Sequence, residues 1–85
     1  MIEHDLQIHH PLGLHAQASA RVVQTLAPYT CQVTLLAKGR EVNAKSIMGV
    51  MLLAAGPGST LRARADGADE AEAMAALVAL FANAF

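Results

Sequence analysis

One histidine of this chain lies where a turn is expected to pass into a helix. His15 follows Gly13 and precedes a run of small and apolar residues that begins at Ala16. The first N–H groups of a helix have no partner inside it and carry the positive end of its dipole, so such a place binds anions and favours a neutral imidazole. A neutral imidazole has a free ring nitrogen that acts as a nucleophile. The pattern therefore predicts a phosphate acceptor, and a histidine that only begins a helix is the structural alternative.

A second segment, thirty residues later, is also expected to begin a helix. Ser46 precedes the short apolar run at 47–53. A serine hydroxyl in this position caps a helix and contributes about 1 kcal/mol. Gly49 weakens the helix interior by about 1 kcal/mol relative to alanine, but a short helix is still the structure that the pattern favours.

Hydrophobic patterns along the rest of the chain predict a mixed fold. Alternation over four short runs is typical of half-buried strands, and Lys38-Gly39 is typical of a hairpin turn. Pro28 is expected to end the first helix, and Asp69 to cap the last. The expected strands cover residues 2–8, 31–37, 40–43 and 60–65, and the expected helices cover residues 16–27, 47–53 and the stretch after residue 69. The order βαββαβα predicts an α+β fold in two layers, with helices over one face of a sheet.

The helical patterns also mark the apolar positions of two helices. The apolar residues of the first helix that recur at helical spacing are Ala16, Ala20, Val23 and Ala27, with Val22 and Leu26 beside them. In the last helix one stripe is expected to face the sheet, and it consists of Ala73, Met74, Leu77, Leu80 and Phe81. Such stripes are typical of surface helices that pack on a core.

Composition argues against several classes of function. Six Lys and Arg are scattered among seven Asp and Glu, and the net charge of −1 comes without the basic run or aromatic ladder of a nucleic-acid-binding protein. The apolar runs are too short to span a membrane, and the first residues lack the pattern of a signal peptide. We therefore expect one domain over residues 1–85 that is cytoplasmic and monomeric, without a cofactor or a membrane or nucleic-acid partner.

The cysteine and the histidines do not predict a metal site. The single cysteine, Cys31, falls in an alternating strand pattern and is expected to be a core thiol. The spacing of His4, His9, His10 and His15 does not place three ligands on one element, and neighbours along a strand face opposite sides. No metal is expected.

The segments GLHAQASA at 13–20 and KSIMGVM at 45–51 resemble the HPr family, the histidine-containing phosphocarrier proteins of the bacterial phosphotransferase system. The resemblance covers nearly the whole chain. It implies an open-faced β-sandwich, in which a four-stranded antiparallel sheet in the order 1-4-2-3 carries three helices on one face. It also implies that Nδ1 of His15 accepts a phosphoryl group from phosphorylated Enzyme I and passes it to a IIA-type protein. Such a protein is a relay carrier rather than a turnover enzyme.

The chain departs from the family signature directly after the histidine. The signature Gly-[Leu/Ile]-His-[Ala/Thr]-Arg-Pro-Ala has Arg and Pro where this chain has Gln17 and Ala18. Replacing a charged guanidinium by a neutral amide removes hydrogen bonds of roughly 1.5 to 3 kcal/mol and leaves weaker ones, which would slow transfer about ten- to a hundredfold. Ala18 supplies a backbone N–H that Pro lacks. The predicted phosphate-facing residues are therefore His15, Gln17 and Ala18.

The sequence and this resemblance leave three functions open. The first is the phosphocarrier. The second is a transfer-impaired regulatory relative that binds a partner and is controlled at Ser46, which resembles the serine modified by HPr kinase/phosphorylase. The third is a plain interaction domain. The predicted docking patch around His15, which family members use for Enzyme I, consists of Ala16, Ala20, Ile47, Met48 and Met51, although these side chains can instead fill the core.

Overall fold

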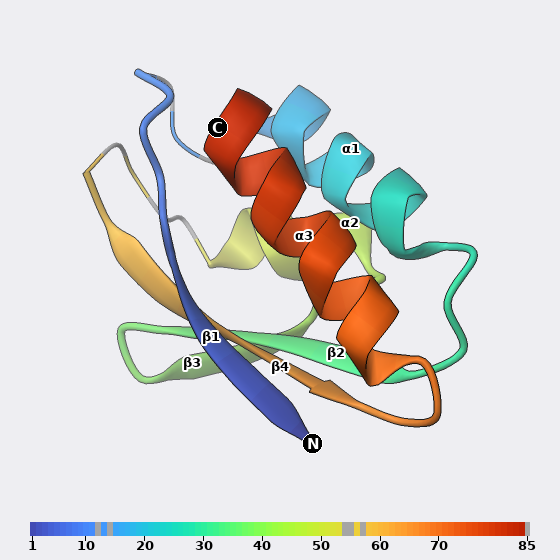
Figure 1. Cartoon of the computed structure of the whole chain (residues 1–85). Coiled ribbons are helices and arrows are strands. Elements are labelled where there is room, and N and C mark those ends of the chain that lie inside the picture. The colour runs from blue at the N-terminus through green and yellow to red at the C-terminus, as the bar shows by residue number, and fades with distance from the viewer. Residues whose placement is uncertain (12, 14, 54–55, 57, 85) are drawn as a thin grey trace.

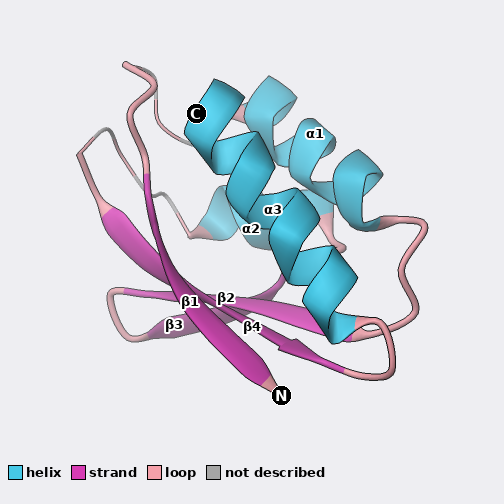
Figure 2. Ribbon diagram, viewed as in Figure 1, coloured by secondary structure: helices cyan, strands magenta, loops and turns pink. Residues whose placement is uncertain are grey.

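The computed structural model describes residues 1–11, 13, 15–53, 56 and 58–84, and within them four strands and three helices form two layers (Figure 1). The elements are β1 (Ile2–Gln7), α1 (Ala16–Leu26), β2 (Gln32–Ala37), β3 (Arg40–Asn43), α2 (Ile47–Leu52), β4 (Thr60–Asp66) and α3 (Glu70–Ala84). All three helices lie over the same face of the sheet (Figure 2). The predicted order of elements and the two-layer α+β architecture are confirmed.

The sheet is antiparallel and has the strand order β1-β4-β2-β3. Its register pairs Leu6 of β1 with Leu61 of β4, so buried side chains meet on the helix-covered face. The hairpin between β2 and β3 turns at Lys38 and Gly39, whose φ values are both positive, at 53° and 75°. Two positive φ values in a two-residue loop match the twist of the flanking strands. The order 1-4-2-3 implied by the family resemblance is thus confirmed.

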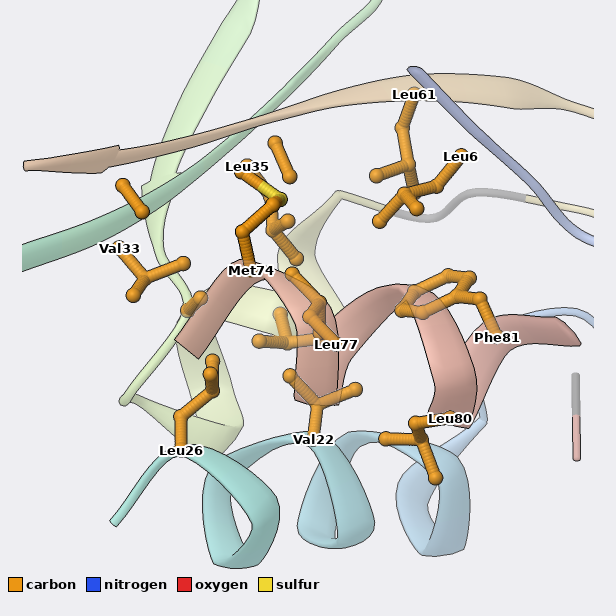
Figure 3. Packing of buried hydrophobic residues seen from close by; sticks show 14 of the residues in the cluster. Leu6, Val22, Leu26, Val33, Leu35, Leu61, Met74, Leu77, Leu80 and Phe81 are labelled. Atoms are coloured by element: carbon orange, nitrogen blue, oxygen red, sulfur yellow. The ribbon is translucent and has the colours of Figure 1, made fainter. Parts of the chain in front are cut away.

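The core lies between the sheet and the helices (Figure 3). Helix α3 packs against β1, β4 and α1, whereas α2 packs against α1 and β3. The predicted stripe of α3 is buried in full, and it consists of Ala73, Met74, Leu77, Leu80 and Phe81. Cys31 is 3% exposed, which confirms the core thiol, and burial raises the pKa of that thiol.

The apolar residues of α1 divide between the core and the surface. The buried residues of this helix are Ala18, Ser19, Val22 and Leu26. Ala16 and Ala27 are exposed, and Ala20 and Val23 are half-buried. Alanine at regular spacing fits either face of a helix, but only one face carries the larger Val22 and Leu26. Burying those two side chains removes more apolar surface from water, so they turn inward and the alanine stripe does not.

Asp69 joins the start of α3 to the start of β2. Its carbonyl accepts the N–H of Ala73 at 3.0 Å, so it holds the predicted capping position. Its carboxylate instead accepts the N–H groups of Thr30 at 2.8 Å and of Cys31 at 2.9 Å. The expected side-chain cap is therefore replaced by a link to the two residues directly before β2, which precede Asp69 by 39 and 38 positions. The N–H of Thr30, ahead of the smaller contribution of Cys31, lowers the pKa of Asp69.

Gly67 precedes this junction and lies against Cys31. Its φ is 154°, and a Cβ at this position would stand 2.6 Å from Cβ and 2.7 Å from Cα of Cys31. No real side chain fits there without moving the backbone. Glycine at this place allows the turn after β4 to pass directly over the core.

We expect Gly67→Ala to lower the free energy of unfolding by about 1 to 3 kcal/mol, because overpacking at this contact must shift backbone. Chemical denaturation monitored by circular dichroism measures the change. Gly56→Ala is the matched control, since nothing lies within 4 Å of a Cβ there and its φ is not positive. Equal losses in the two variants would contradict this account.

The lowered pKa of Asp69 predicts a pH dependence of stability. The folded-state pKa lies below the unfolded value of about 3.9, so the stabilisation is complete above about pH 4 and is lost as pH falls through the folded pKa. Asp69→Asn should therefore be less stable than the natural chain at pH 7, with a difference that shrinks toward pH 2. Urea midpoints across this range measure it, with Glu72→Gln as the control, and a difference independent of pH would sink the prediction.

Candidate functional site

His15 lies at the point where α1 begins. Its carbonyl accepts the N–H of Ser19 at 2.9 Å, the first hydrogen bond of the helix, and its own backbone is extended, with φ −78° and ψ −178°. Its side chain makes no capping hydrogen bond to the helix and is half-buried. Because the ring does not cap α1, it lacks the purely structural role that was the alternative prediction.

The backbone in front of His15 is held by a glycine turn. The N–H of Gly13 donates to the carbonyl of His10 at 3.0 Å, and the N–H of His15 donates to the carbonyl of Gly13 at 3.1 Å. Gly13 has a φ of 64°, in the left-handed region that glycine adopts without steric cost. The predicted turn into the helix is confirmed, and it sets the direction from which α1 starts.

The first turn of α1 presents the expected backbone donors. The N–H groups of Ala16, Gln17 and Ala18 precede the first intrahelical donor, Ser19, so the helix itself offers them no acceptor. The turn contains no acidic residue that would repel an anion. Gln17 is exposed, whereas the methyl group of Ala18 is 1% exposed and belongs to the core. Ala18 can therefore face a phosphate only through its N–H.

A second imidazole lies beside His15. The ring centroids of His10 and His15 are 5.0 Å apart, and the ring planes are inclined by 59°. Sequence reasoning missed this pair because it treated His10 only as a metal ligand and as a neighbour of His9. The one signal available was Gly13, a residue typical of turns, which stands between the two histidines in the chain.

Ser46 caps α2, as the sequence predicts. Its Oγ accepts the N–H of Gly49 at 3.1 Å, and its carbonyl accepts the N–H of Val50 at 3.0 Å. A Cβ on Gly49 would lie 3.2 Å from the carbonyl oxygen of Asn43 and 3.4 Å from Oγ of Ser46. Glycine has a low helix propensity, but at this position the missing Cβ lets the end of β3 and the capping Ser46 lie close to α2.

The chain matches the protein family described as "PTS HPr component phosphorylation site" over residues 2–83. It is 58% identical to the phosphocarrier protein HPr of Xylella fastidiosa, with all of this chain and 96% of the relative covered. The chain belongs to the HPr family. A crystal structure of HPr from Thermoanaerobacter tengcongensis superposes with a TM-score of 0.92 at 40% identity, covering 96% of this chain and 92% of that one. The HPr-like protein Crh of Halalkalibacterium halodurans is 43% identical over 93% of this chain and 94% of its own.

One helix of this HPr-family chain exposes apolar side chains. The exposed side chains of α2 form what we call the α2 apolar surface: Ile47 (44%), Met48 (73%), Met51 (44%) and Leu52 (61%). The alternative that the first three fill the core is therefore wrong. Leu52 was not predicted, because its exposure depends on how α2 is rotated against α1 and β3. Solvent-exposed methionines on a surface of this kind adapt to partners of different shape.

Ser19 is a buried polar residue one turn into α1. It is fully buried, and its hydroxyl has no hydrogen-bond partner among the residues that the structure describes. An unpaired buried hydroxyl costs about 1 to 3 kcal/mol. Sequence reasoning missed Ser19, because its burial follows from the rotation of α1 that also buries Val22 and Leu26.

Neither a metal cluster nor a membrane-spanning helix is found in the described ranges. No three His, Cys, Asp or Glu side chains there lie close enough together to hold a metal ion. No helix in the same part of the chain is long and apolar enough to cross a membrane.

We expect Ser46→Ala to lower the free energy of unfolding by about 1 kcal/mol, because the N–H of Gly49 loses its acceptor. Ser59→Ala, outside any helix start, is the comparison variant. Thermal and urea unfolding of both measure the difference. If the two variants were equally stable, the cap would not contribute as the geometry indicates.

Proposed function

We propose that this chain is a phosphocarrier that accepts a phosphoryl group on His15 from phosphorylated Enzyme I and passes it to a IIA-type protein. One observation carries the proposal: the half-buried imidazole at the start of α1 makes no capping bond to the helix, beside backbone N–H groups that have no intrahelical acceptor. Membership of the HPr family supports the same reaction.

The proposed step needs little from the protein except positioning and charge stabilisation. The lone pair of a His15 ring nitrogen attacks the phosphorus, an N–P bond forms, and the bond from phosphorus to the donor atom breaks with its electron pair returning to the donor. During transfer the negative charge stays on the phosphoryl oxygens. The N–H groups of Ala16, Gln17 and Ala18 would donate hydrogen bonds to those oxygens.

Docking of the two partner proteins is proposed for the side of the molecule formed by α1 and α2. Ala16 is exposed and Ala20 is half-buried on α1, and the α2 apolar surface lies on the helix that packs against it. A partner that covers these side chains removes apolar area from water, which drives association. Arg21 is the only charged residue within these two helices, and the guanidinium of Arg40 donates to the carbonyl of Leu52 at the end of α2.

A second candidate function is favoured by Gln17. This exposed amide offers the phosphoryl group no positive charge, and the chain is also 43% identical to an HPr-like protein Crh. In this candidate the chain transfers phosphate slowly and signals by binding a partner. HPr kinase/phosphorylase would control it by adding about two negative charges at Ser46, beside the α2 apolar surface.

The decisive experiment incubates the natural chain with Enzyme I and phosphoenolpyruvate and measures acid-labile phosphate by mass spectrometry. We expect one phosphoryl group per chain, absent from His15→Asn and retained in His4→Asn, whose ring lies exposed on β1. Gln17→Arg should accelerate transfer about ten- to a hundredfold, because it restores charge-assisted hydrogen bonds.

The outcomes separate the two candidates. A natural chain that passes its phosphoryl group on to a IIA-type protein within seconds supports the carrier. A chain that does so only after Gln17→Arg supports the regulatory relative. Phosphate that persists in His15→Asn, or that never appears in any variant, overturns the role of His15.

A further inference from the structure

The imidazoles of His10 and His15 are brought together by the backbone. The N–H of Gly13, which stands between them in the chain, donates to the carbonyl of His10 at 3.0 Å. The ring centroids lie 5.0 Å apart, and both residues are half-buried. A group attached to one ring therefore lies within reach of the other.

We propose that His10 is a second functional imidazole of this site, which donates hydrogen bonds and positive charge to the phosphoryl group on His15. The inference rests on the proposed function, since it concerns the phosphorylated chain. His10 would supply the positive charge that Gln17, a neutral amide, does not offer.

The charges near the site explain why a second imidazole matters there. A phosphoryl group on His15 adds about two negative charges. In α1 the only charged side chain is that of Arg21, α2 has none, and in α3 the last charged residue is Glu72, in its first turn. His9, which is exposed, precedes His10 in the chain. The imidazole of His10, in contrast, lies directly beside the ring of His15.

An imidazole changes its charge close to neutral pH, and in its protonated form both ring nitrogens donate. Opposite charges about 4 Å apart attract by roughly 1 kcal/mol even in water, which corresponds to a rate effect of about fivefold. The contribution of His10 should therefore be larger at pH 6 than at pH 8.5. A ring that only packs against His15 would contribute equally at both values.

The test compares rates of phosphoryl transfer from Enzyme I to the natural chain, His10→Asn and His10→Phe at pH 6 and pH 8.5. His10→Asn removes the charge and the ring, whereas His10→Phe keeps a ring without charge. We expect both variants to be about fivefold slower than the natural chain at pH 6 and nearly equal to it at pH 8.5. His9→Asn is the matched control and should follow the natural chain at both values.

The possible results distinguish this inference from the proposed function. If the natural chain takes up no phosphoryl group, both fail. If it is phosphorylated on His15 and the His10 variants match it at pH 6, only the role of His10 fails. A pH-independent loss in His10→Asn that His10→Phe restores would show packing alone and also overturn the inference. Unfolding midpoints confirm that each compared variant is folded, and the two substitutions provide independent tests.

Discussion

The hydrogen bond from the Ser19 N–H to the His15 carbonyl decides where α1 begins, and the candidate site depends on that place. One residue earlier or later, a different side chain would stand at the helix start. With this bond in place, His15 has an extended backbone and a ring outside the helix, while three N–H groups follow it without an intrahelical acceptor. Gly13 contributes from the other side, because its left-handed backbone turns the chain so that the helix starts directly after the histidine.

The starts of α1 and α2 differ in how their first N–H groups are satisfied. The hydroxyl of Ser46 accepts the N–H of Gly49 and caps α2. The imidazole of His15, at the start of α1, makes no capping hydrogen bond. The charged side chains that pair with one another lie mainly on the open face of the sheet, where Arg62 contacts Asp5 and Arg64 contacts Glu3.

Much of the fold was accessible to sequence reasoning, because strand alternation and helix stops are local properties. The bounds of α1 were correct to one residue, since Pro28 cannot continue a helix. β1 was predicted to include Ile8, which is buried and still exchanges two backbone hydrogen bonds with Gly58 and Ser59 beyond the strand end. The pattern left open which side of α1 faces inward, because evenly spaced alanines provide little hydrophobic contrast between the two sides of a helix.

The sequence by itself determined the order of elements, the helix start at His15 and the cap at Ser46, because turns, caps and periodicity act over a few neighbouring residues. Only the tertiary structure decided how each helix is rotated on the sheet, and hence that Ser19 is buried and Leu52 is exposed. It also decided that the ring of His10 lies against His15 and that the carboxylate of Asp69 binds the N–H groups just before β2 rather than those of its own helix. These contacts depend on where whole elements pack, and no local pattern encodes that packing.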